Sequence, residues 1–197
     1  LMDYPGGVMC LPVVFVKIES AAVRGKPVDG HFSQLIADDL ATYINAGIST
    51  DHECTTEMEA REKLELGMQI AIREGSAAKN FDALIGLLAE YPGRMMLCSD
   101  DKHPDDLVAG HINQLVARAM REGLDLWDVL TAACVTPVRH YGLDVGQMQV
   151  GDRADLIRIN DLKDLQVAET LIGGHRVSKG GAEQFQVDPP PAVNQFV

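Results

Sequence analysis

The sequence is poor in cysteine, and its cysteines are not closely spaced. The four cysteines among 197 residues are Cys10, Cys54, Cys98 and Cys134, and no two of them form a CxxC pair. This spacing argues against a zinc ribbon or a disulfide framework and predicts a reduced, cytoplasmic setting. No apolar run approaches the roughly 20 residues of a membrane-spanning helix. Residues 1–5 carry no basic group, unlike a signal peptide, and we expect the chain to open within a domain.

Basic residues are also scarce relative to acidic ones. The chain has 17 Lys and Arg against 29 Asp and Glu, which gives a net charge of -12. This charge argues against nucleic acid or an acidic membrane surface as the partner. With 46% hydrophobic and 23% charged residues, the composition is that of a globular protein with one large or two small domains.

Apolar runs and helical periodicities alternate along the first two thirds of the chain. The expected strands are 26–31, 47–53, 68–76 and 94–101, and the expected helices are 34–47, 55–67, 80–93 and about 105–122. Strands that alternate with helices over short links predict an α/β fold with a parallel sheet and right-handed crossovers.

A reactive side chain follows each of the four expected strands. These residues are His31, His52, Glu74 and Asp100, each about one strand–helix unit after the last. A single histidine at a strand end is more often a hydrogen-bonded structural group. Four polar residues in phase indicate a functional edge, because the carboxyl ends of parallel strands lie side by side, as in a (β/α)8 barrel.

The remainder of the chain has a different pattern. Residues 124–143 predict a helix pair that packs around Trp127, Leu130 and Ala133, and short strands separated by Gly-Gly turns predict a small antiparallel β unit beyond it. Prolines near the end predict a linker. The expected division is a partial barrel at 1–145, a small β domain at 146–182 and a linker or tail at 183–197.

The residue types at the strand ends favour metal chemistry. Histidine and carboxylate side chains bind zinc, iron and manganese, and a bound ion activates water as a nucleophile. His31, His52 and Asp100 on successive strands can supply such a site. Glu53, Glu74 and Asp101 are candidates for proton transfer or substrate contact.

Several of these segments together resemble one enzyme family. The stretches "GKPVDGH", "GISTDHECTTEMEAREKLELGM", "IREGSAAKN" and "CSDDKHPDDLVAGHI", continued by "TPVRHYGL" and "VGDRADL", are similar to the adenine deaminases of the metal-dependent amidohydrolase superfamily. The resemblance covers roughly residues 1–180. It implies the second half of a (β/α)8 barrel followed by part of a small β domain, and the hydrolysis of adenine to hypoxanthine and ammonia in purine salvage.

The resemblance also implies roles for individual residues. His31 and His52 correspond to metal ligands on strands five and six, and Asp100 to the strand-eight carboxylate, which binds metal and shuttles a proton. Glu53 is a possible partner in proton transfer. The resemblance implies two divalent ions, iron or manganese, with zinc as an alternative. The candidate substrate contacts are Glu74, Ser76, Asp101 and His103.

The chain departs from the family pattern in its metal ligands. The HxH motif of the first barrel strand occurs nowhere in the sequence, and the family's bridging glutamate would lie before residue 1. Residues 32–34 also replace the usual Pro-Gly turn. We therefore expect the chain alone to be inactive and to associate with a missing N-terminal half or with copies of itself.

Two other functions remain open, and one is excluded. The chain is alternatively a non-catalytic truncated homologue that acts as an assembly subunit, or a hydrolase of other cyclic amides or amidines. The zinc-dependent nucleobase deaminases of the other kind carry HxE and PCxxC, and neither motif occurs here.

Other polar segments have plainer interpretations. The run "EMEAREKLE" (57–65) predicts a solvated helix face with i,i+4 ion pairs. The histidines that we expect to be structural are His111, His140 and His175.

Overall fold

The computed structural model describes residues 1–34 and 37–188. Positions 35–36 of the helix predicted at 34–47, and positions 189–197 of the predicted tail, lie outside the described residues. The chain divides into two compact units, Leu1–Asp144 and Val145–Val197. Among the described residues, no helix reaches the length and hydrophobicity that crossing a membrane requires.

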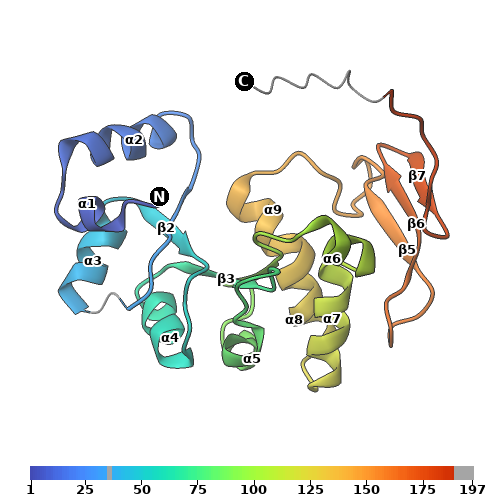
Figure 1. Ribbon diagram of the computed structural model, residues 1–197, viewed down its shortest axis with the longest axis horizontal. Coiled ribbons are helices and arrows are strands. Elements are labelled where there is room, and N and C mark those ends of the chain that lie inside the picture. Colours follow the sequence, from blue (N-terminus) through green and yellow to red (C-terminus); the bar gives the residue numbers. More distant parts are fainter. Residues whose placement is uncertain (35–36, 189–197) are drawn as a thin grey trace, which may run out of the picture. The chain divides into compact units, whose positions relative to one another are not determined.

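The first unit contains a four-stranded parallel sheet (Figure 1). Its strands are β1 (Val28–Asp29), β2 (Ile48–Asp51), β3 (Gln69–Arg73) and β4 (Met95–Cys98), and they pair in chain order. Each neighbouring pair is parallel. The predicted α/β architecture of four consecutive strand–helix units is therefore confirmed.

The helices between these strands lie together on one side of the sheet in Figure 1. They are α3 (Ala37–Asn45), α4 (Glu57–Glu65) and α5 (Phe81–Leu84), the last continuing as a 3-10 turn at Ile85–Ala89. Two helices, α1 (Tyr4–Val8) and α2 (Pro12–Ala22), precede β1. A core cluster that includes Val14, Phe32, Leu40, Tyr43 and Ile48 joins this beginning of the chain to the sheet.

The central residues of β3 are buried on both faces of the sheet. Ile70, Ala71 and Ile72 are three successive buried residues of β3, so this strand does not alternate between buried and exposed side chains. Parallel strands are usually buried on both faces, so their sequence does not show which side chains point to which face.

The helix predicted at about 105–122 is two helices, so that prediction is wrong. They are α6 (Pro104–Ala109) and α7 (Ile112–Arg121), separated at Gly110 with φ 157°. With ψ 172°, this backbone conformation is one that essentially only glycine adopts, which explains the glycine at the break.

The helical stretch that follows is continuous, and its packing differs from the prediction. It runs through α8 (Leu126–Leu130), a π-helical turn at Thr131–Val135 and α9 (Thr136–Tyr141). Val129 and Ala132 are buried, whereas Trp127 is 72% exposed. The prediction that the helices pack around Trp127 is therefore wrong, because the buried stripe passes through smaller residues on another side.

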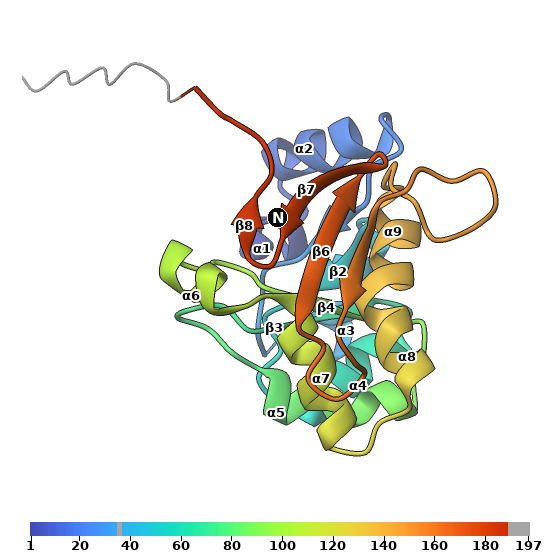
Figure 2. The same ribbon diagram turned by 90° about the vertical axis from the view of Figure 1, so that its right-hand side faces the viewer.

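The second unit is a four-stranded antiparallel sheet, as predicted (Figure 2). Its strands are β5 (Leu156–Ile159), β6 (Val167–Ile172), β7 (His175–Lys179) and β8 (Ala182–Glu183), and each pairs with the next. The Gly173-Gly174 turn has φ of 57° and 81°, the left-handed conformation of tight hairpin turns.

The N-terminus of α4 provides a test of the fold. Thr56 is the N-cap, and its hydroxyl accepts a hydrogen bond from the Glu59 N–H at 3.3 Å. Replacing Thr56 by alanine should lower the free energy of unfolding by about 1 kcal/mol, because one helical N–H loses its acceptor. Urea unfolding measures this change. Thr56→Ser retains the hydroxyl and should lose far less; equal losses in both variants would contradict the capping role.

Candidate functional site

Two histidines meet at the carboxyl ends of β1 and β2. The Nδ1 atom of His31 lies 3.2 Å from the Nε2 atom of His52. Gly30 brings them together, since its N–H donates to the Thr50 carbonyl at 2.6 Å. A Cβ on Gly30 would lie 2.9 Å from that carbonyl oxygen, so only glycine allows β1 to pass so close to β2.

The carboxylate of Glu53 completes a group of three potential ligands. Its Oε1 lies 3.1 Å from His31 Nδ1 and 3.5 Å from His52 Nε2. One ligand atom from each of the three residues lies within 4.8 Å of the others. Ligands of a tetrahedral ion with bonds of about 2.0–2.2 Å are separated by roughly 3.3 Å, so the spacing and donor types fit one divalent metal ion.

Arg73 connects this group to the predicted strand-eight carboxylate. Its guanidinium donates to both Glu53 oxygens at 2.5 and 2.9 Å and to Asp100 Oδ2 at 2.7 Å. Burial opposes the charge on Arg73, but the hydrogen bonds that it donates to the two carboxylates leave its pKa above the ordinary value. Asp100 is thus linked to the histidine group through Arg73 and Glu53. The backbone of Asp100 has φ 50°, a left-handed conformation that aspartate tolerates better than most residues.

His31, His52, Arg73 and Asp100 open onto a cavity of about 350 Å³. The residues that line it are Leu1, Met2, Asp29, Gly30, His31, His52, Arg73, Ala77, Ala78, Asp100 and Asp101. His31, His52, Asp100 and Asp101 therefore share one space at the carboxyl edge of the sheet.

Glu74, also predicted at this edge, makes a different contact. Its carboxylate lies 3.4 Å from the guanidinium of Arg118 on α7. The residue of β3 that reaches the histidine group is its neighbour Arg73. Sequence reasoning missed Arg73 because β3 is buried on both faces, so the order of Arg73 and Glu74 does not show which of them faces the site.

Ser76 and His103 lie in two loops that are bonded to each other. The Ser76 hydroxyl donates to the Asp106 carboxylate and accepts the His103 N–H at 2.9 Å. The Ser76 N–H donates to the Asp101 carbonyl at 2.9 Å. His103 is the N-cap residue of α6 but makes no side-chain capping bond. The loops after β3 and β4 are therefore held together beside the cavity.

The histidines expected to be structural are not members of this group of three ligands. His111 precedes α7, and its N–H bonds to the Asn113 side chain. His140 on α9 contacts the Thr50 hydroxyl, and burial lowers its pKa. His175 begins β7 and is exposed.

Asp51, Glu59 and Lys63 form a buried ionic group next to the segments that carry the histidines. Glu59 and Lys63 on α4 are only 8% and 0% exposed, so the prediction of a solvated helix face at 57–65 is wrong for these two residues. Their i,i+4 ion pair is present at 2.8 Å, but it is buried with Asp51. The exposed pair on the same helix, Arg61 with Glu57 at 2.8 Å, matches the prediction.

Comparison with known proteins gives a consistent family assignment. The model of the amidohydrolase family matches residues 14–177. The chain is 56% identical over 196 residues to an adenine deaminase of Salinibacter ruber and 48% identical over 197 residues to one of Methanosarcina mazei. All of this chain aligns in both cases, but it spans only 36% of the length of either relative.

Solved structures show the same fold at low sequence identity. A β-aspartyl dipeptidase of Fervidobacterium islandicum superposes with a TM-score of 0.69 at 17% identity, covering 91% of this chain and 54% of that one. An N-acetyl-D-glucosamine-6-phosphate deacetylase of Mycobacterium smegmatis superposes with a TM-score of 0.58 at 20% identity, covering 83% and 51%. These likenesses establish the architecture.

Thiol reactivity tests the burial of the site's surroundings. Burial raises the pKa of the Cys98 thiol to about 12, and burial and the nearby Asp51 carboxylate raise the pKa of Cys54 well above its usual range. A thiol with a pKa near 12 holds roughly a thousandfold less thiolate at pH 8 than an ordinary cysteine. At pH 8, Ellman's reagent should modify exposed Cys10 quickly, exposed Cys134 more slowly because burial raises the pKa of its thiol, and Cys54 and Cys98 slowest of all.

The rate of thiol modification should rise with pH, because only the thiolate form of cysteine reacts. The slow phase should accelerate continuously as the pH rises toward 12, without a plateau near 9. Cys10→Ser should remove the fast phase and leave the slow one. Modification of Cys54 in the native chain at the rate of Cys10 would contradict the buried arrangement.

Proposed function

The chain belongs to the amidohydrolase family, and on that premise we propose that it supplies part of the catalytic barrel of an adenine deaminase. The observation that carries the proposal is the His31, His52 and Glu53 group at the carboxyl edge of the parallel sheet. Two relatives named adenine deaminase, 56% and 48% identical, support the choice of substrate. The reaction belongs to purine salvage.

The metal site is proposed from the chain's own ligands. Members of this family are metal-dependent, and His31, His52 and a carboxylate from Glu53 or Asp100 would hold a divalent ion. When bound, such an ion supplies Lewis-acid activation of water near neutral pH. We propose two ions, manganese or iron, with zinc as the alternative; further ligands would come from outside these 197 residues.

The carboxylates have distinct roles in the proposed hydrolysis. Water adds to C6 of adenine, the bond from C6 to the exocyclic nitrogen breaks, and hypoxanthine and ammonia leave. Asp100 takes the proton from the attacking water and returns it to the departing amine. Glu53 gives a proton to the purine ring as water adds, and it recovers a proton from the added hydroxyl as the C6 carbonyl of hypoxanthine forms. Arg73 holds both carboxylates by hydrogen bonds at 2.5 to 2.9 Å, so the two proton carriers keep a fixed separation.

The substrate contacts are proposed from the loops around the cavity. Asp101 lines the cavity beside Asp100, and Ser76 and His103 lie in the bonded loops after β3 and β4. Glu74 reaches substrate only if its contact with Arg118 is exchanged for one with the purine.

The two ends of the parallel sheet offer places for a partner. Among the described strands, β1 and β4 are the two ends of the parallel sheet, and closing a barrel requires further strands at both. We propose that the missing half of the barrel, or another copy of the chain, pairs there, and that unit 2 belongs to a small β domain. The part of the chain that the structure describes contains no disulfide, which agrees with a cytosolic setting.

The alternatives predict different results in one assay. A hydrolase of another cyclic amide or amidine would act on those compounds and leave adenine intact. A non-catalytic assembly subunit would hydrolyse none of them. The relatives at 44–56% identity carry the name adenine deaminase, which favours adenine deamination over both alternatives.

Asp100→Asn tests the proposed mechanism. In the protein expressed as its gene encodes it and loaded with manganese, ammonia release from adenine should fall about 10²- to 10⁴-fold, the usual contribution of a positioned acid–base group. Metal content and unfolding midpoint are measured alongside.

Asp105→Asn is the matched control, since Asp105 is an exposed carboxylate in the first turn of α6. It should retain full turnover. Near-normal turnover of Asp100→Asn with metal bound would remove Asp100 from the mechanism.

A further inference from the structure

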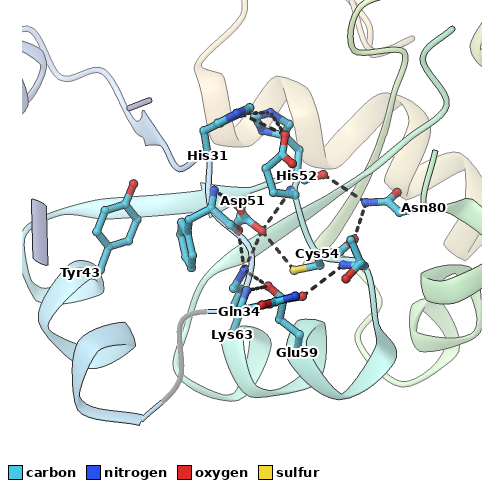
Figure 3. A network of polar contacts seen from close by, with 12 residues as sticks. His31, Gln34, Tyr43, Asp51, His52, Cys54, Glu59, Lys63 and Asn80 are labelled. Atoms are coloured by element: carbon cyan, nitrogen blue, oxygen red, sulfur yellow. Dashed lines mark hydrogen bonds and ion pairs between the residues drawn. The ribbon is translucent and has the colours of Figure 1, made fainter. Parts of the chain in front are cut away.

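A fully buried lysine lies behind the histidine pair. Lys63 on α4 is 0% exposed, and its Nζ donates to Asp51 Oδ2 at 2.9 Å, Glu59 Oε1 at 2.8 Å and the Phe32 carbonyl at 3.1 Å (Figure 3). A lysine has three protons to donate, and all three are used. The Nζ also lies 3.8 Å from the centre of the Phe32 ring.

The partners of Lys63 belong to the two segments that carry the candidate ligands. Phe32 directly follows His31, and Asp51 directly precedes His52. Asp51 also accepts the Phe32 N–H at 3.4 Å, the Glu53 N–H at 3.2 Å and the Cys54 thiol at 3.1 Å. One carboxylate thus receives groups from both segments.

Glu59 holds the same two segments further along the chain. Its Oε1 accepts the Gln34 N–H at 2.8 Å, and its Oε2 accepts the Thr55 N–H at 3.2 Å. Asn80 holds the second segment from β3: its amide donates to the carbonyls of His52 and Cys54 at 3.1 and 3.0 Å and accepts the Arg73 N–H at 2.8 Å.

The ionic group does not itself enter the site. Among the described residues, the cavity lining includes His31 and His52 but not Asp51, Glu59 or Lys63. Desolvation of Lys63 is offset by Asp51 and Glu59, so its pKa stays above the ordinary value and the side chain remains charged. A buried ion group of this kind is often no more stabilising than apolar residues of the same volume, so stability alone does not explain it.

We propose that Lys63, with Asp51 and Glu59, is a positioning residue that fixes His31, His52 and Glu53 at the spacing of one metal ion. This inference rests on the proposed metal site. Outer partners of metal ligands commonly set affinity by 10- to 100-fold, because they fix ligand orientation before the ion binds.

The test is the affinity for Co²⁺, read from its visible absorption, in the protein expressed as its gene encodes it. Lys63→Met should weaken binding about 10- to 100-fold and change the absorption spectrum. The backbone amides of Phe32, Gln34, Glu53 and Thr55 should also exchange with deuterium faster, since their acceptors lose the shared cation.

Two control variants on the same helix separate positioning from stability. Arg61→Met removes an exposed cation that pairs with Glu57 and Glu90 and should leave Co²⁺ binding unchanged. Leu64→Ala removes a side chain that is 2% exposed, so it should destabilise the fold while leaving the Co²⁺ affinity and spectrum of the folded protein unchanged.

Glu59→Gln keeps the test decisive if Lys63→Met does not fold. It retains the lysine and the side-chain shape, but it removes a charge and replaces one of the two oxygens that accept the Gln34 and Thr55 N–H groups by an amide donor. Co²⁺ binding should therefore weaken in the same direction. Unchanged affinity and spectrum in the folded variants, or an equal loss in Leu64→Ala, would overturn the positioning role. If the unsubstituted protein binds no Co²⁺, the proposed metal site itself fails, and the inference fails with it.

Discussion

The ion pair between Lys63 and Asp51 is the contact on which the geometry of the site depends. Both side chains are 0% exposed, and Asp51 is the last residue of β2, immediately before His52. Removing one member of a buried pair typically costs on the order of 3–5 kcal/mol, because the other charge is left without a partner. The pair also spans two segments that are distant in sequence, so the histidine group and the packing of α4 depend on each other.

The sequence predicted the backbone arrangement of the site better than its polar contacts. His31 and His52 follow consecutive parallel strands, so the strand–helix spacing alone placed them side by side. The buried role of Glu59 and Lys63 was not predictable in this way, because a helical segment rich in acidic and basic residues is usually solvated. Their burial follows from a tertiary contact with Asp51 and the Phe32 carbonyl, which no local pattern encodes.

Arg73 and Trp127 show two other limits of sequence patterns. Period-2 alternation identifies the inward side chains of a strand only when one face is solvated, and β3 is buried throughout its centre. Trp127 is the largest apolar side chain of its helix, yet Val129 and Ala132 are the buried residues. Size and hydrophobicity indicated that this helix packs, but not which side of it faces the sheet.

The central claim is that His31 and His52 bind one metal ion together. X-ray absorption of the cobalt-loaded protein measures it directly, because imidazole ligands give a characteristic multiple-scattering signal. The account predicts that His31→Ala and His52→Ala each lose imidazole signal from the bound ion, while His175→Ala, at an exposed position in the other unit, does not. An unchanged imidazole signal in either His31→Ala or His52→Ala would contradict the account.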